Sequence, residues 1–406
     1  MSLSGNALVG QSGGPTAVIN QTLVGVIKAA LAADEIGAVY GAIHGIGGIL
    51  AGEICDLSAE DPDNLEVVAG TPSSALLSVR LKPTDDICRR IFERFKQLDV
   101  RYFFYIGGND TAETTHIINE MARADGYELR CFHCPKTIDN DLLVTDHCPG
   151  YGSAARWVCQ AFMGDNLDNR SLGGIKINIV MGRDAGWLTA ASALARVFPE
   201  DGPHVIYCPE ADFDLARFCA EVEAVYRRIG RCVIAVSEGV HGPGGAAIVD
   251  LGEVDSHGNR QLSGSGALGD FLADTLKAHM GKAFPDQKHR IRADTFGYLQ
   301  RCFPGVVSEV DAAEARRAGE AAVAAARSGE HDSGSIAFRR AEGAYAVDTF
   351  VTPLSTVAKD TKAMPRDWLN EAGNDVVEDK LMPYLRPLVG ALPAIGQLTM
   401  QRIEMP

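Results

Sequence analysis

The chain has 406 residues, 46% hydrophobic and 22% charged, and its 38 Lys and Arg against 53 Asp and Glu give a formal net charge of −15. This is the composition of a globular protein with enough chain for about two or three domains, and it excludes a disordered chain and a disulfide mini-scaffold. The negative charge, with no long basic run, argues against partners such as nucleic acid or an anionic membrane.

Neither a membrane span nor a secretory signal is expected. No stretch approaches the ~18 apolar residues of a spanning helix, and the N-terminus lacks a basic region and a cleavage site. The 10 cysteines are scattered through apolar runs, which is typical of buried thiols in a reducing compartment. Cys131 and Cys134 form a CxxC pair, but no second pair follows at zinc-ligand spacing. The sequence therefore favours a cytoplasmic protein without a zinc site.

Short apolar runs alternate with amphipathic patterns, which predicts an α/β protein with a mainly parallel sheet. We expect strands at 7–10, 38–43, 102–106, 129–134, 175–181, 205–208 and 232–237, and helices at 17–32, 84–98, 111–124, 188–196, 214–229 and 267–280. The Ala-rich segment 312–330 is expected to form a surface helix. A domain boundary is expected near residue 150, and the proline-containing segment 381–406 is expected to pack across the body.

Two glycine-containing turns follow predicted strands. In 10–16, GQSGGPT, glycines before a helix allow the backbone to approach a phosphate, although they also serve an ordinary strand-to-helix turn. In 105–111, YIGGNDT, polar residues stand at the carboxyl end of a strand, where open α/β sheets bind ligands. The alternative for this second turn is that Thr111 and Asp110 only stabilise the start of a helix.

The segment 135–141, PKTIDND, carries the clearest chemistry. Asp139 and Asp141 flank an amide, and Lys136 lies three residues before the first carboxylate. This set suits binding of phosphate and magnesium together with proton transfer, and an ordinary Asp-rich turn does not account for the lysine.

Further polar residues follow two other predicted strands. Arg183 in MGRDAGW projects a guanidinium suited to anions, and Glu238 ends the strand CVIAVSE. Arg301 in the segment YLQR is a second candidate arginine. Each one alone is more often a surface or salt-bridged residue, but their joint placement at strand ends favours a site.

Taken together, the motifs resemble those of the phosphofructokinases, in particular the pyrophosphate-dependent group. The motifs SGGP, GGND, PKTIDND, MGRDAGW, PE at 209–210, SEG at 237–239 and GYLQR match in order and approximate spacing over residues 5–305. The resemblance implies two similar Rossmann-like α/β domains with the active site in the cleft between them. Residues 1–149, completed by part of 305–380, would bind the phosphoryl donor, and residues 150–304 would bind the sugar phosphate.

The resemblance also implies the reaction and its cofactor. A phosphoryl group would pass reversibly from pyrophosphate to the 1-hydroxyl of fructose 6-phosphate, giving fructose 1,6-bisphosphate and phosphate. Such transfer depends on charge neutralisation and in-line positioning, which cationic side chains and Mg²⁺ supply. The enzyme would be a homodimer or homotetramer.

Roles carry over residue by residue. Asp139 would take the proton from the sugar 1-hydroxyl, and Asp141 would support the metal and its loop. Gly14 would present its backbone N–H to the donor phosphates, while Arg80 and Lys136 would supply charge to the donor. The sugar phosphate would contact Thr137, Ile138, Met181, Gly182, Arg183, Glu238, Tyr298, Leu299, Gln300 and Arg301.

Donor choice is expected to depend on Asp110 and Lys136. ATP-using relatives carry glycine at position 110, in a GGDG motif, and commonly at 136 also. A carboxylate at 110 would occupy the space of the α-phosphate and nucleoside and would repel phosphate oxygens, whereas the shorter pyrophosphate would fit. Lys136 would then compensate for the fewer contacts that the smaller donor makes.

The sequence departs from the family pattern at two places. Asn109 replaces the aspartate that is the presumed magnesium ligand of GGDG, but an amide oxygen can still coordinate a hard cation, so we expect Asn109 in the metal site. Gly174 and Lys176 stand where compact bacterial relatives lend an arginine from a neighbouring subunit. Three alternatives stay open: an ATP-dependent phosphofructokinase, a non-catalytic sugar-phosphate-binding subunit, and an enzyme like the diacylglycerol or NAD kinases.

Overall fold

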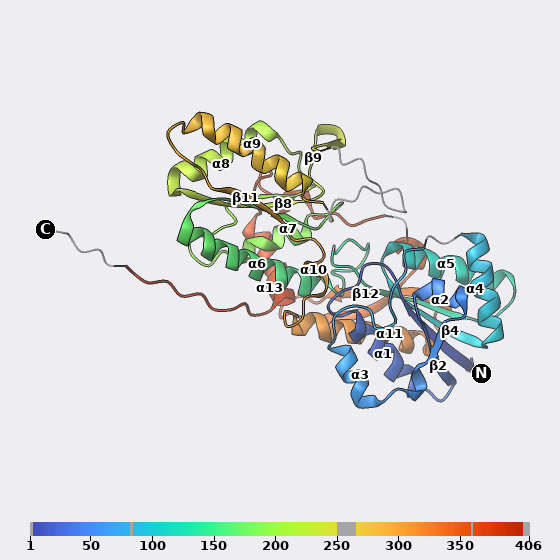
Figure 1. Ribbon diagram of the computed structural model, residues 1–406. Helices are drawn as coiled ribbons and strands as arrows, with labels where there is room; N and C mark the ends of the chain where they lie inside the picture. The colour runs from blue at the N-terminus through green and yellow to red at the C-terminus, as the bar shows by residue number, and fades with distance from the viewer. Residues whose placement is uncertain (1–2, 82–83, 250–264, 359, 401–406) are drawn as a thin grey trace.

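The computed structural model describes residues 3–81, 84–249, 265–358 and 360–400. It contains two main β-sheets, each with helices on both faces (Figure 1). The two sheets are mainly parallel, as predicted, but one has seven strands and the other four. Within the described residues, no helix is both long enough and apolar enough to cross a membrane.

The larger sheet has the strand order β13-β12-β5-β4-β1-β2-β3. Its strands are β1 (Gly5–Gln11), β2 (Ile36–Ala42), β3 (Ile54–Asp56), β4 (Val100–Gly107), β5 (Arg130–Pro135), β12 (Ser333–Arg340) and β13 (Val347–Thr352). The five central strands pair in parallel, whereas the edge strands β3 and β13 are antiparallel to their neighbours. Strands from both ends of the chain therefore share one sheet.

Alternation along the strands fills both faces of this sheet. On β4, Phe104 packs with α1 and α11, whereas Phe103 and Tyr105 pack on the opposite face with α4 and α5. The first face is covered by α1 (Ile19–Leu31), α3 (Pro62–Ala69) and α11 (Glu309–Ser328), and the second by α2 (Gly45–Ala51), α4 (Asp85–Gln97) and α5 (Asn109–Ala124). The short 3₁₀ helix η1 (Leu57–Ala59) follows the edge strand β3 of this sheet.

Helix α11 corrects one prediction. A surface helix was expected at 312–330, and a helix does form there, but it is not a surface element, because its small residues are buried against α1. Ala315, Ala318 and Ala322 are fully buried, and a Cβ at Gly319 would lie 2.2 Å from the carbonyl oxygen of Thr22. The alanines and the glycine thus allow two helices to pack closely above the sheet.

The smaller sheet has the order β11-β6-β8-β7, with all pairs parallel. Its strands are β6 (Gly174–Val180), β7 (Val205–Tyr207), β8 (Arg231–Ser237) and β11 (Ile291–Thr295). One face is covered by α8 (Leu215–Ile229) and α9 (Ala267–Ala283). The other is covered by α6 (Tyr151–Leu172), α7 (Trp187–Ala191), η2 (Ser192–Ala195) and α13 (Glu378–Val389). Beside this sheet lie β9 (His241–Gly242), η3 (Pro243–Gly245), β10 (Ala246–Ala247) and α10 (Leu299–Cys302).

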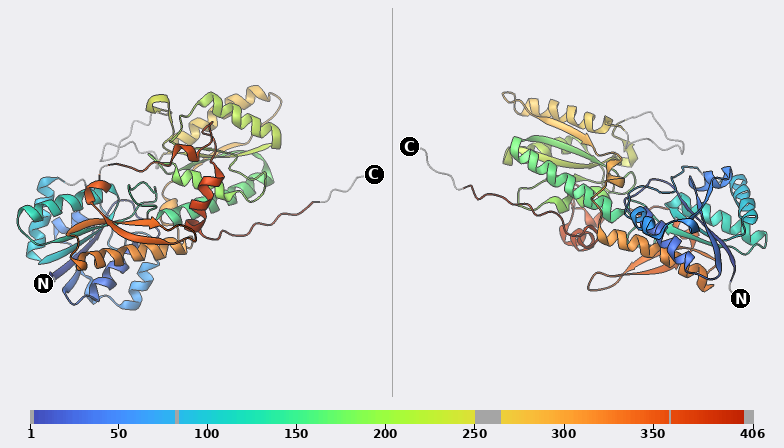
Figure 2. Two further views of the ribbon diagram at one scale, coloured as in Figure 1. Left: turned by 180° about the vertical axis from the view of Figure 1, so that it is seen from behind. Right: turned by 60° about the horizontal axis from the view of Figure 1, so that its bottom comes forward.

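The C-terminal part of the chain returns from the large sheet to the small one. After β13 it passes through α12 (Leu354–Val357) and η4 (Arg366–Trp368) to α13, which packs on α6. In the described part of the segment expected to pack across the body, α13 packs on α6, and Leu392 and Ile395 pack against the same core. Residues 396–400 instead extend away from the body (Figures 1 and 2), and Leu398 is 80% exposed. Gly390, Pro393 and Gly396 explain why no helix continues there.

Candidate active site

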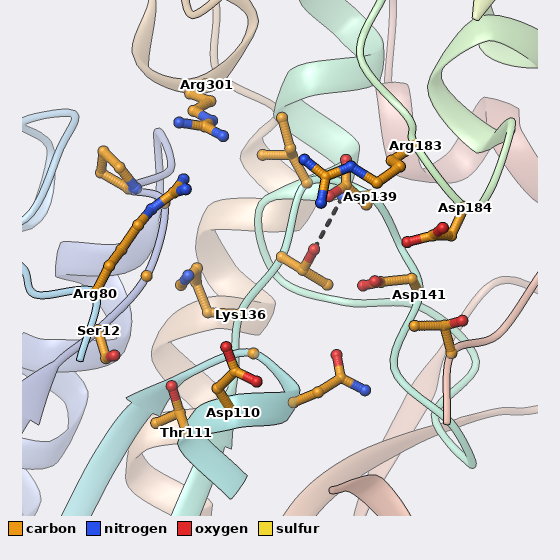
Figure 3. A pocket seen from close by; sticks show the side chains of 18 of the residues that line it. Ser12, Arg80, Asp110, Thr111, Lys136, Asp139, Asp141, Arg183, Asp184 and Arg301 are labelled. Carbon is orange, nitrogen blue, oxygen red and sulfur yellow. Dashed lines mark hydrogen bonds between the residues drawn. The ribbon is translucent and has the colours of Figure 1, made fainter. Parts of the chain in front are cut away.

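A pocket of about 430 Å³ lies between the two sheets, where loops from both meet. It is lined by residues after β1, β4 and β5 of the large sheet and after β6 and β8 of the small one (Figure 3). Among the predicted site residues, it brings together Gly14, Arg80, Asn109, Asp110, Lys136, Thr137, Ile138, Asp139, Asp141, Met181, Arg183, Glu238 and Arg301. Motifs far apart in sequence therefore form one concave surface.

The glycine turn after β1 lies directly against two cationic side chains. A Cβ at Gly13 would lie 3.1 Å from the Lys136 ammonium nitrogen, and one at Gly14 would lie 3.2 Å from the Arg301 guanidinium carbon. Gly13 also has φ +76°, a conformation that favours glycine. The glycines therefore leave room for an anion to contact both the backbone and the cations.

Arg80, Lys136 and Arg301 make one end of the pocket strongly cationic. Figure 3 shows the guanidinium groups of Arg80 and Arg301 on the same side of the pocket as the Lys136 ammonium. Lys136 is 4% exposed, and burial, followed by the charge of Arg301, lowers its pKa to about 8. Burial also lowers the pKa of Arg301. Three mutually repelling cations in one place favour a polyanionic ligand.

The loop after β5 presents its two carboxylates through a left-handed residue between them. Asn140 has φ 58°, its side chain donates to the Tyr384 hydroxyl at 2.7 Å, and it accepts from the Cys148 backbone N–H at 3.0 Å. The Thr137 hydroxyl accepts from the Asp139 backbone N–H at 3.0 Å (Figure 3). The loop is thus held from within and by a residue of α13.

Asp139 has the environment of a base. Burial, together with the charges of Asp141 and Glu238, raises its pKa to about 7. The pKa of Asp141 is also raised, chiefly by burial. A carboxylate whose pKa lies near neutrality accepts a proton more readily than a solvated one.

Asn109 and Asp110 begin helix α5. Asp110 is exposed and lines the pocket in the first turn of the helix, where a carboxylate interacts favourably with the helix dipole. Asn109 donates from its side-chain amide to the carbonyl oxygens of Val357 at 3.1 Å and Asp360 at 3.0 Å. Because both hydrogen bonds use the amide nitrogen, the side-chain oxygen of Asn109 is the atom left to coordinate a cation.

The site fits a magnesium ion that arrives with a phosphate ligand. Within the described residues, no group of three or more His, Cys, Asp or Glu side chains could hold a metal alone. Mg²⁺ commonly uses only one or two carboxylates together with substrate phosphates. Asp141 offers such a ligand, because its buried Oδ1 has no hydrogen-bond partner among the residues that the structure describes.

Four of the predicted substrate contacts do not line the pocket. Tyr298 and Leu299 are 57% and 60% exposed, and the Arg301 guanidinium stacks on the Tyr298 ring at 4.7 Å. Gln300 is buried behind the site, where its Oε1 accepts from the Met181 backbone N–H at 3.2 Å. Gly182 shapes the same loop, and its N–H donates to Glu238 at 3.5 Å. These residues act on the pocket through Met181, Arg301 and Glu238.

Lys176 does not line the pocket of its own chain. Its ammonium group forms ion pairs with Asp294 and, at 3.8 Å, with Asp165. These partners keep Lys176 on the β6 side of the small sheet, outside the pocket lining.

Sequence reasoning missed Ala358 and Thr361, which line the pocket although they lie more than 200 residues after Asp139. They belong to the segment that returns from β13 to α13. No motif marks this segment, so the sequence carried no signal that it reaches the site. Tyr384, which holds Asn140, lies farther along the same return path.

Replacing Tyr384 by phenylalanine should lower kcat about tenfold with little change in KM. Asn140 is fully buried, and the variant leaves its amide without the hydroxyl that orients it, which costs about 1–3 kcal/mol. Tyr127→Phe is the matched control, because the Tyr127 hydroxyl donates to the Val100 carbonyl away from the pocket. Equal kcat values in the two variants would show that Tyr384 contributes stability only.

Comparison with known proteins shows similarity along almost the whole chain. The family model described as Phosphofructokinase matches residues 6–326. A pyrophosphate–fructose 6-phosphate 1-phosphotransferase of Rhodospirillum rubrum is 51% identical over 390 residues, which cover 95% of this chain and 94% of the relative. A pyrophosphate-dependent phosphofructokinase structure from Marinobacter aquaeolei has a TM-score of 0.84 and 33% identity, and covers 99% of this chain and 98% of its own. A phosphofructokinase from Saccharomyces cerevisiae, at 16% identity and a TM-score of 0.67, shares the fold.

Proposed function

This chain belongs to the phosphofructokinase family, and we propose that it moves a phosphoryl group from pyrophosphate to the 1-hydroxyl of fructose 6-phosphate. The products are fructose 1,6-bisphosphate and phosphate. The observation that carries the proposal is the pocket itself, in which the half-buried base Asp139 faces a cationic end formed by Arg80, Lys136 and Arg301. This is an arrangement for transferring a doubly charged group from a small polyanion to an alcohol.

The chemical step divides between the two ends of the pocket. Asp139 accepts the proton of the 1-hydroxyl as its oxygen attacks phosphorus, and Thr137 holds the loop in place. Lys136, Arg80 and the Gly14 backbone stabilise the charge that develops on the departing phosphate. Arg183, Met181 and Glu238, from the small sheet, bind the sugar phosphate beside Asp139. The carboxylate and the cations therefore act on opposite sides of the transferring group.

We assign magnesium to the carboxylate of Asp141 and the side-chain oxygen of Asn109. Bound together with pyrophosphate, Mg²⁺ would neutralise charge on the donor oxygens. Asp141 lies beside the base, so the metal charge would also act on the Asp139 carboxylate.

The donor domain is assigned to residues 1–149 together with part of 305–380, because β12 and β13 complete its sheet. Residues 150–304, with α6 at their start, form the sugar-phosphate domain.

We also propose that the protein is cytoplasmic and forms a homodimer or homotetramer. The cysteines of the chain are free thiols, which suits a reducing compartment. The apolar side chains of Leu398 and Met400 are 80% and 69% exposed, which suits contact with another subunit.

The test measures fructose 1,6-bisphosphate formation with fructose 6-phosphate and Mg²⁺, comparing pyrophosphate and ATP at equal concentrations. We expect product with pyrophosphate and none above background with ATP. Product with ATP alone would overturn the donor assignment. No product with either donor, from a protein that still binds fructose 6-phosphate, would identify a non-catalytic subunit.

A further inference from the structure

One return segment touches several of the loops around the pocket. We call it the strap and define it as Val357, Ala358 and residues 360–364. It contacts the loop after β4 through Asn109, the loop after β5 through Asp141, α7 through Trp187 and the loop after β7 through Glu210. The strap therefore joins loops from both sheets at one edge of the pocket.

The strap is pinned most closely to the catalytic loop. The Lys362 backbone N–H donates to the Asp141 carbonyl at 2.6 Å, and Thr361 forms an antiparallel bridge with Leu142. The Lys362 ammonium donates to the carbonyls of Thr145 at 3.0 Å and Asp146 at 2.8 Å. A displacement of the strap would therefore move the backbone that carries Asp141 and, two residues earlier, Asp139.

At its other end the strap is held by the two hydrogen bonds of Asn109. Both bonds use the side-chain NH₂ group, which donates to the carbonyls of Val357 and Asp360. An aspartate has the same shape but only acceptor oxygens when ionised, so it would face two carbonyl oxygens with no proton between them. The geometry therefore calls for an amide at position 109.

We propose that Asn109 is a positioning residue that anchors the strap and, through it, the catalytic loop. This role uses the nitrogen of the side chain and is separate from any contact of its oxygen with magnesium. It explains why asparagine stands before Asp110 in this chain. Its kinetic part rests on the proposed function, whereas its structural part does not.

The experiment uses two variants, Asn109→Asp and Asn109→Ala, which both remove the NH₂ donor. Hydrogen exchange of the strap amides is measured on the full-length protein without substrates, and kcat and KM are measured with pyrophosphate. We expect strap exchange to rise about tenfold to hundredfold in both variants. We expect kcat to fall about tenfold in both, with KM for fructose 6-phosphate within about threefold, because Arg183 and Arg301 belong to other segments, after β6 and in α10.

Asn6→Asp is the matched control. The Asn6 side chain also donates to a backbone carbonyl, that of Leu98 at 2.8 Å, at the end of β1 away from the pocket. This variant should lose stability without faster strap exchange or a change in kcat. Strap exchange that stays at the wild-type rate in both position-109 variants would overturn the proposal, as would an Asn109→Asp variant with full kcat. Because exchange needs no turnover, a wrong substrate assignment would leave the structural result readable.

Discussion

Replacing Asp139 by asparagine should lower kcat about 10²–10⁴-fold while fructose 6-phosphate still binds. The amide has nearly the same shape as the carboxylate but cannot accept the proton of the 1-hydroxyl. The residues proposed to bind the sugar phosphate, Arg183, Met181 and Glu238, are unchanged in this variant. Steady-state rates with pyrophosphate, together with calorimetric binding of fructose 6-phosphate, measure the two effects separately. A variant with near-normal turnover would refute the assignment of the base.

The pH dependence provides the control for this result. A base acts when it is deprotonated, and the pKa of Asp139 is raised to about 7 by burial and by Asp141 and Glu238. The wild-type kcat/KM should therefore fall as the pH decreases through this pKa and should reach a plateau at higher pH. Asp139→Asn should lose this acid limb. If the limb persists in the variant, another group titrates, and the rate loss has a different cause.

The positions of the central strands along the chain could be predicted because buried parallel strands are continuous apolar runs. All seven predicted strands overlap strands of the structure, from β1 to β8. In the two main sheets the missed strands are β3, β11, β12 and β13, and all of these except β12 are at sheet edges. In β11, IRADT, polar residues interrupt the apolar pattern, so periodicity did not separate this strand from a loop.

Helix α6 escaped prediction for a different reason. It starts at Tyr151 after Gly150, without a side-chain cap, and its first five residues are all buried. A Cβ at Gly152 would lie 2.8 Å from the Leu388 carbonyl, so this glycine allows α13 to pack against α6. Because the first turn of α6 is buried on all sides and carries a glycine at a contact, the amphipathic period that marks a helix is lost where this helix begins.

The pocket could be predicted from sequence to the extent that its residues follow strands. Asp110, Lys136, Asp139 and Arg183 stand at carboxyl ends of parallel strands, and these ends meet at one edge of each sheet. The strap could not be predicted, because it reaches the site through backbone carbonyls and amides that any sequence possesses. Tyr298 shares a motif with Arg301 but does not line the pocket, because neighbouring residues in a short helix face different directions.

Replacing Asp110 by glycine should admit ATP as a donor, and we expect kcat/KM for ATP to rise at least about tenfold. Asp110 is exposed in the first turn of α5 and lines the pocket near Lys136, so its carboxylate repels phosphate oxygens that extend past the pyrophosphate position. Loss of its interaction with the helix dipole costs only about 0.3–1 kcal/mol, so the variant should fold. Adding Lys136→Gly should lower kcat/KM for pyrophosphate by a further large factor, because the buried ammonium is a main charge at the donor end.

Asp110→Asn separates charge from size in this argument. The amide fills the same space without the negative charge. Equal ATP activity in Asp110→Asn and Asp110→Gly would therefore show that charge repulsion by Asp110 excludes ATP. ATP activity in Asp110→Gly alone would show that the size of the side chain excludes ATP. Rates with both donors, measured at saturating fructose 6-phosphate and Mg²⁺, give the ratio directly. If ATP stays inactive in all three variants, Asp110 does not exclude the nucleotide, and the strap beside it, at Ala358 and Thr361, becomes the wall to test.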